Sequence, residues 1–200
     1  MNENKQAITT IKSGNELFEF NGATAGFKLM EFWQWSVSDL VSNATRGRLA
    51  EFIVAKSLGI DTSKIPRDEW QAYDLKTPDG TKVEVKSAAY IQSWYQKSLS
   101  EITFSIKKSR HWDPETNQQS KESSRQADIY VYCLLFHKDK DTINSLDLDQ
   151  WKFYILSKND LESYKRSQHS ITLKSLEKLT HAVGYGDLKN RVKSARINSK

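Results

Sequence analysis

The chain has one cysteine and no long apolar run. Cys133 is the only cysteine among 200 residues, which excludes an intramolecular disulfide and a multi-cysteine zinc cluster. The longest apolar run is residues 129–136, too short to span a bilayer, and no signal-peptide hydrophobic segment follows Met1. The sequence therefore predicts a soluble, cytoplasmic protein with no membrane partner, in which Cys133 is a small buried side chain.

Zinc and phosphate-loop motifs are also lacking. The four histidines do not have the spacing of a zinc pair or of an HNH-type site, and solvated or packed side chains explain them better. Gly184 and Gly186 have neither the preceding strand nor the lysine of a phosphate-binding loop, so a turn is expected there.

The positive charge is concentrated near the C-terminus. The chain has 30 basic and 25 acidic residues, and residues 161–200 hold nine of the basic and three of the acidic ones. An acid-free basic series within this segment suits contact with DNA phosphates, and it equally suits a solvated tail. The residues of this series proposed to contact nucleic acid are Lys189, Arg191, Lys193 and Arg196.

The length predicts one domain with four regions. Residues 1–15 are expected to be a flexible arm, and residues 27–58 two helices. Residues 70–157 would form the sheet core, and residues 158–200 C-terminal helices and the basic tail. The oligomeric state stays open, with a homodimer as one alternative.

Helical spacing of apolar residues predicts the two N-terminal helices. The first covers residues 27–40, and its aromatic stripe favours packing against another helix more than a ligand platform. The second runs from about Ala44 to Leu58, with Ser42 or Asn43 as its N-cap and Gly59 as its C-terminal stop.

Alternating and continuous apolar patterns predict five strands, of which the fourth is buried on both faces. The polar segment 107–126 is expected to be a long loop or lid with at most a weak helix. Helical periodicity returns in residues 159–165 and 171–179, before the two glycines interrupt it. The predicted strands are residues 73–75, 81–86, 102–106, 128–136 and 151–156.

The predicted hairpin of the first two strands carries a possible catalytic cluster. A period of two puts Val83 and Val85 on the core face and Glu84 and Lys86 on the other, where Asp74 would join them. Two neighbouring carboxylates repel unless they share a hard cation such as Mg²⁺. A lysine beside a metal-bound water is an arrangement that can hydrolyse a phosphodiester. The alternative is that Glu84 and Lys86 only form the solvent-exposed face of an edge strand.

Glu51 stands out on the second predicted helix because it shares a face with small and apolar residues. A carboxylate buried there needs a partner, since an unpaired interior charge costs several kcal/mol. The metal site is one candidate partner. The alternative is a buried ion pair with Arg46, Arg48 or Arg125.

The series of Glu51, Asp74 and Glu84-Val85-Lys86 resembles the PD-(D/E)XK, or restriction-endonuclease-like, nuclease superfamily over residues 43–136. Tyr73 stands in place of the proline of that name. The segments Arg46-Gly47-Arg48-Leu49-Ala50-Glu51, Tyr73-Asp74-Leu75 and the stretch from Glu84 to Trp94 look like an uncharacterised bacterial family of the superfamily.

The resemblance implies an α/β fold with an αβββαβ core and a mixed central sheet. Its second helix would be a short one in the polar segment or one supplied by residues 88–98. The resemblance also implies metal ligation by Asp74, Glu84 and the Val85 carbonyl. Lys86 would be the catalytic lysine, Glu51 a ligand or water-holder, and Gln92 a contact to the site or the DNA.

The resulting prediction is a Mg²⁺-dependent DNA endonuclease in which Mn²⁺ can replace Mg²⁺. One alternative is a catalytically silent nuclease-like module that binds nucleic acid or protein. Another is a regulatory partner protein that uses its aromatic N-terminal helix as an interface.

Overall fold

A four-stranded mixed sheet forms the centre of the molecule in the computed structural model, which describes residues 8–113 and 117–197. Its strands, in spatial order, are β3 (Leu75–Lys76), β4 (Lys82–Ala89), β8 (Ile129–Leu135) and β9 (Trp151–Ser157). β3 pairs antiparallel with β4, β4 parallel with β8, and β8 antiparallel with β9. The predicted α/β fold with a mixed central sheet is confirmed.

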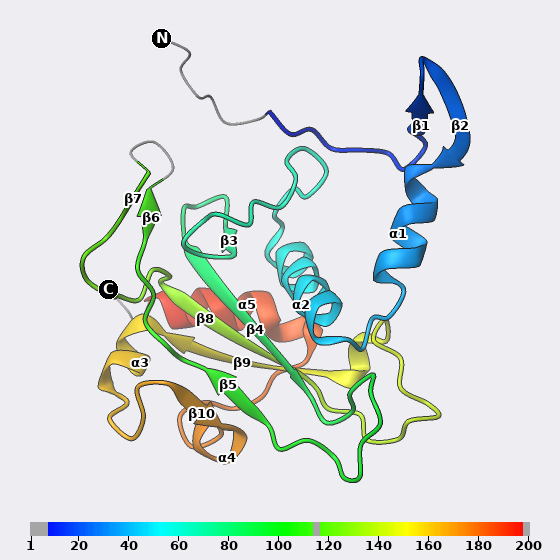
Figure 1. Ribbon diagram of the computed structural model, residues 1–200. Coiled ribbons are helices and arrows are strands. Elements are labelled where there is room, and N and C mark those ends of the chain that lie inside the picture. The colour runs from blue at the N-terminus through cyan, green and yellow to red at the C-terminus, as the bar shows by residue number, and fades with distance from the viewer. Residues whose placement is uncertain (1–7, 114–116, 198–200) are drawn as a thin grey trace.

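Two layers cover the sheet, one on each face (Figure 1). Helices α2 (Asn43–Leu58) and α5 (Tyr185–Ile197) share one apolar cluster with the sheet. The second cluster lies on the opposite face, so every residue of β8 is buried, as its continuous apolar run predicts. The elements on that opposite face are β5 (Thr103–Ser105), α3 (Lys158–Ser163), β10 (Ser170–Thr172) and α4 (Leu173–Leu176), with β5 and β10 paired.

Helix α2 follows its sequence signals closely. It begins after Ser42, and it ends at Gly59, which adopts the left-handed conformation at φ 74°. The Gly59 N–H donates to the carbonyls of Ala55 and Lys56, which satisfies groups that the helix end leaves free. These contacts fix the direction in which the chain leaves α2 toward the loop of residues 60–74.

The N-terminal part projects from this body instead of packing on it (Figure 1). It consists of β1 (Leu17–Phe20), β2 (Ala23–Lys28) and α1 (Leu29–Val37). The aromatic stripe was expected to pack against a helix, and that expectation is wrong: no residue of α1 is buried, and Trp35 is 84% exposed. Residues 8–13 of the predicted arm are exposed coil, and residues 1–7 lie outside the described part.

The chain between β5 and β8 contains a small hairpin where a helix was expected. It is made of β6 (Trp112–Asp113) and β7 (Gln118–Gln119). Neither residues 88–98 nor the described residues of the segment 107–126 form a helix. The second helix of the implied αβββαβ core is therefore absent from the part of the chain described. The polar composition of this segment gives a helix no apolar face to bury.

The C-terminal region also differs from its prediction. The first expected helix is α3, but residues 171–179 divide into strand β10 and the short helix α4. Helix α5 begins at the glycine pair that was expected to interrupt helical structure. It is no tail, because Leu188, Val192 and Ala195 pack into the same cluster as α2. Apolar residues at positions i, i+4 and i+7 are the signal for this packing.

Two predictions about solvent and membrane can be compared with the structure. Cys133 has no exposed surface, as expected, and burial raises the pKa of its thiol. No helix among the described residues is long and apolar enough to cross a bilayer.

Because α5 completes the core, we expect Leu188→Ala to lower the free energy of unfolding by about 2–5 kcal/mol through loss of buried contacts and formation of a cavity. Urea denaturation measures the change, and Asn190→Ala, on the exposed face of the same helix, is the control. Equal effects of the two substitutions would contradict the packing role of α5.

Candidate active site

The site is built on the outer edge of β4, beyond its short pairing with β3. Asp74 directly precedes β3, and its Oδ2 accepts a hydrogen bond of 2.7 Å from the main-chain N–H of Val85. The N–H and C=O of one strand residue point to the same side, so the Val85 carbonyl also faces this edge. A carboxylate and a carbonyl oxygen thus lie side by side on an unpaired stretch of strand.

Glu84 and Lys86 project from the same stretch of β4. Val83 and Val85 are buried against α2, so Glu84 and Lys86 lie on the other face, as the period of two predicts. The Lys86 ammonium contacts the Glu84 carboxylate, and its Nζ lies 3.9 Å from Oδ2 of Asp74. The structure therefore brings Asp74, Glu84 and Lys86 together.

Glu51 comes from α2 and is 9% exposed. Both of its carboxylate oxygens are bonded to the Arg67 guanidinium: Nη2 donates to Oε1 at 3.0 Å, and Nε donates to Oε2. The ion-pair alternative is thus the observed one, but none of the three arginines considered for it is the partner. Arg67 lies in the irregular loop after α2, where no periodic pattern indicates which way its side chain points.

The three expected partners of Glu51 are engaged elsewhere. Arg46 donates to the Val41 carbonyl and to Asn43 near the start of α2. Arg48 is exposed and pairs with Glu69. Arg125 lies on the other side of the sheet, where it donates to the carbonyls of Ile106 and Leu161 and pairs with Glu162.

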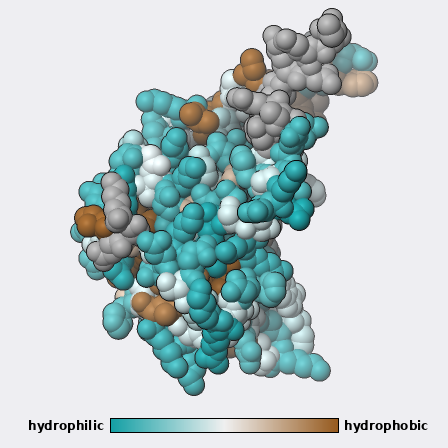
Figure 2. Space-filling model, turned by 90° about the vertical axis from the view of Figure 1, so that its left-hand side faces the viewer, coloured by the Kyte–Doolittle hydropathy of each residue, from teal (hydrophilic) through white to brown (hydrophobic). Residues whose placement is uncertain are grey.

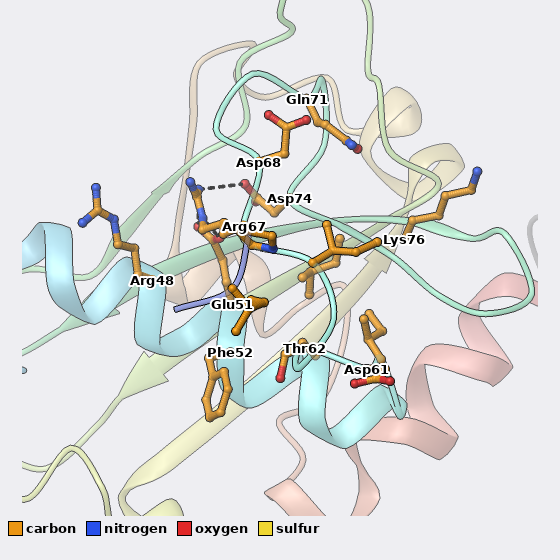
Figure 3. A pocket seen from close by; sticks show the side chains of 16 residues that line it. Arg48, Glu51, Phe52, Asp61, Thr62, Arg67, Asp68, Gln71, Asp74 and Lys76 are labelled. Carbon is orange, nitrogen blue, oxygen red and sulfur yellow. Dashed lines mark hydrogen bonds and ion pairs between the residues drawn. The ribbon is translucent and has the colours of Figure 1, made fainter. Parts of the chain in front are cut away.

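Arg67 also links Glu51 to the cluster on β4. Its Nη2 lies 4.0 Å from Oδ1 of Asp74, an interaction drawn as a dashed line in Figure 3. Negative and positive groups therefore alternate from Glu51 through Arg67, Asp74 and Lys86 to Glu84. Arg67 is the site residue that sequence reasoning missed.

The pKa shifts report how these charges depend on one another. Burial, and then the neighbouring Asp74 carboxylate, raise the pKa of Glu84. Burial opposes the charge of Lys86, but the Glu84 and Asp74 carboxylates outweigh it and raise the pKa of that ammonium. The hydrogen bonds to Glu51 raise the pKa of Arg67. The carboxylates thus hold both cations charged, while burial and then the neighbouring Asp74 carboxylate penalise ionised Glu84.

The donor set fits a hard cation in part. Asp74, Glu84 and the Val85 carbonyl supply oxygen ligands of the kind that Mg²⁺ prefers. Among the described residues, however, no group of three histidine, cysteine or acidic side chains is arranged to hold a metal ion. At this site, Arg67 occupies both oxygens of Glu51. The residues present suit a site with two carboxylates rather than three.

Gln92 is held inside the loop that follows β4. Its Nε2 donates to the Ala89 carbonyl at 2.9 Å and to Ser100 Oγ at 3.3 Å. Its Oε1 accepts from Arg46 Nη1 at 3.4 Å, which ties this loop to the start of α2. These bonds give Gln92 a structural role in this loop, whereas the resemblance implies that Gln92 contacts the site or the DNA.

The four basic residues of α5 divide into two groups. Lys189, Lys193 and Arg196 line a hollow of about 230 Å³ beside the turn between β3 and β4, where Arg196 pairs with Asp79. Arg191 instead donates to Thr180 Oγ1 at 3.1 Å. The first three therefore share a surface that Arg191 does not join.

A cavity of about 410 Å³ opens between α2 and the loop of residues 60–74. Glu51, Arg67 and Asp74 line it together with apolar side chains such as Phe52 and Ile65 (Figure 3). The molecular face turned toward the viewer in Figure 2 is mainly hydrophilic, with small separate hydrophobic patches. The cavity therefore meets the cluster at Glu51, Arg67 and Asp74, whereas Glu84 and Lys86 do not line it.

Comparison with known families now adds to this geometry. The family model described as Bacteriophage T4 endonuclease IV matches residues 24–175. The chain belongs to this family. No curated protein is significantly similar to the chain. The endonuclease IV match includes Glu51, Arg67, Asp74, Glu84 and Lys86, whereas α5 lies beyond it.

In this member of the endonuclease IV family, Arg67→Ala should leave Glu51 without its partner. We expect a loss of about 1.5–3 kcal/mol in the free energy of unfolding, the range for hydrogen bonds to charged groups. The control Arg48→Ala removes the exposed pair with Glu69 and should cost about 0–1 kcal/mol. A double-mutant cycle with Glu51→Gln isolates the coupling, and a coupling of zero would refute the pair's contribution.

Glu84→Gln should raise the melting temperature in EDTA at neutral pH, because it removes a carboxylate whose ionisation the folded state disfavours. We expect about 2–4 °C, the effect of roughly 1 kcal/mol in a domain of this size. The gain should vanish below the ordinary glutamate pKa of 4.5, where wild-type Glu84 is also neutral. Exposed Glu101→Gln is the control, and a lower melting temperature for Glu84→Gln would contradict the prediction.

Proposed function

We propose that this protein is a divalent-cation-dependent DNA endonuclease of the PD-(D/E)XK type. The observation that carries the proposal is the convergence of Asp74, Glu84 and Lys86 on the open edge of β4, within the part of the chain that matches the endonuclease IV family. The family supports DNA cleavage. The donor set supports the cation, and the order of the residues along the chain supports the superfamily.

In this proposal Asp74, Glu84 and the Val85 carbonyl hold Mg²⁺, for which Mn²⁺ can substitute. The raised pKa of Glu84, which is due first to burial and then to Asp74, supports it, because a cation between the two carboxylates would favour the ionised form of Glu84 against both causes. When bound, such a cation polarises the phosphoryl oxygen and lowers the pKa of a coordinated water.

The protein's own side chains have distinct tasks. Lys86 keeps its proton because two carboxylates surround it, so it orients the attacking water and offsets the charge that develops on the phosphate. The Arg67 guanidinium lies beside Asp74 of the same cluster, and its planar shape suits binding to phosphate oxygens. Glu51 positions Arg67, and it can join the cation only after Arg67 releases it.

DNA contact outside the cluster is proposed for the basic face of α5. Lys189 and Lys193 are exposed there and contribute charge that phosphates can use. Arg196 and Arg191 are already bonded to Asp79 and Thr180, so their contribution requires those bonds to open. Gln92 supports the loop after β4, and its proposed effect on DNA is indirect.

The proposal is tested by two substitutions in the cluster. Lys86→Ala should retain binding of Mn²⁺ and DNA and lose on the order of 10²-fold or more in the rate of cutting. Glu84→Ala should lose both cutting and the rise in melting temperature that Mn²⁺ gives the wild-type protein. The measurements are single-turnover cleavage and thermal unfolding with and without the ion.

Two substitutions of exposed residues outside the cluster serve as controls for nonspecific effects. Exposed Lys174→Ala and Glu101→Ala should cut DNA and respond to Mn²⁺ as the wild type does. If the wild type binds DNA but cuts no single-stranded, duplex or branched form, a silent binding module replaces the nuclease. If Mn²⁺ gives no thermal shift while cutting persists in EDTA, the proposed cation dependence is refuted and the endonuclease activity stands.

A further inference from the structure

Two tryptophans from distant parts of the chain meet beside the cluster. Trp70 lies in the loop between α2 and β3, and Trp112 lies on β6 of the small hairpin. Their ring centroids are 5.5 Å apart with an interplanar angle of 51°, yet Trp70 is 70% exposed. Burial of a tryptophan is strongly favourable, so the exposed ring of Trp70 beside the half-buried Trp112 leaves an aromatic surface available for stacking.

The pair borders a second hollow, of about 310 Å³, which we call the base pocket. This volume is at the small end of the range of about 300–1,000 Å³ for ligand pockets, which suits one flat ring system. Hydrogen-bonding side chains surround it and offer both donors and acceptors. The polar and charged residues lining the base pocket are Asp68, Gln71, Lys82, His111 and Gln126.

Two residues that line the base pocket are close neighbours of cluster residues along the chain. Tyr73 lines the pocket, and the next residue is Asp74. Lys82 also lines it, and it precedes Glu84 on β4 by two residues, a step of about 6–7 Å along a strand. A strand whose phosphate lies at the cluster can therefore place a neighbouring base in this hollow.

We propose that the base pocket receives one unpaired nucleobase of the DNA strand, next to the phosphate that is cut. The base stacks on the Trp70–Trp112 surface, because aromatic rings bind bases by their faces whatever the base. The surrounding polar groups contact its edge, which in an unpaired base is free of its complement. This inference rests on the proposed DNA cleavage.

The test uses oligonucleotides that carry 2-aminopurine at successive positions, with the Lys86→Ala protein to hold the strand uncut. Stacking quenches the fluorescence of the base that enters the pocket. We expect quenching at one position, and Trp70→Ala or Trp112→Ala should abolish it and weaken binding about 5- to 150-fold, the range for loss of one base stack. Trp94→Ala, at an exposed tryptophan after the other end of β4, should change neither.

Two further measurements exclude misfolding as the cause. Trp112→Phe keeps an aromatic face and should restore most of the quenching and affinity. An abasic nucleotide at the quenched position should weaken binding to the wild type, and weaken binding to Trp112→Ala by clearly less, because the two changes share the stacking contact. Fully additive losses of binding free energy would refute the proposed base pocket.

The outcomes separate this inference from the proposed function. If the protein cuts DNA and the Trp70 and Trp112 substitutions behave like Trp94→Ala, the base pocket is refuted and the endonuclease stands. If the wild type neither binds nor cuts DNA, both fail.

Discussion

The hydrogen bond from the Val85 N–H to Asp74 is the constraint on which the rest of the site depends. It holds a carboxylate from the loop before β3 at the edge of β4, beside the side chain of Glu84 and within 3.9 Å of Lys86. Together with the bonds from Arg67 to Glu51, it fixes the loop of residues 60–74 next to the cluster. The bond needs an unpaired strand edge, and β3 provides one by pairing only with the start of β4.

Crowded carboxylates are tolerated because the protein supplies their counter-ions. Lys86 lies between Asp74 and Glu84, and Arg67 lies between Asp74 and Glu51. A divalent cation entering between Asp74 and Glu84 would compete with Lys86 for the same oxygens, and the displaced ammonium would then be free to face a phosphate or a water. The alternation of charge therefore limits the repulsion among the carboxylates and places two cations where the proposed chemistry can use them.

The sequence predicted the elements that repeat a pattern and missed the contacts that no pattern encodes. The period of two on β4 placed Glu84 and Lys86 correctly, and the glycine stop ended α2 at the right residue. Arg67 could not be found, because its loop has no periodicity and its partner is 16 residues away. The aromatic spacing of α1 is real, but spacing alone does not say whether a neighbouring element exists to cover it.

An open strand edge is also a hazard, since it offers unpaired N–H and C=O groups to another chain. Here the edge of β4 is filled by Asp74, and the charged side chains of Glu84 and Lys86 lie beside it, so a strand from a second molecule would have to bury charge to pair there. A DNA strand differs from a peptide strand, because its phosphates can pair with Lys86 and Arg67, the two cations that here pair with carboxylates. One set of side chains thus both protects the edge against aggregation and leaves it accessible to DNA. A polyanion can offset the cost of burying these charges by forming ion pairs, whereas the uncharged backbone of a strand edge cannot.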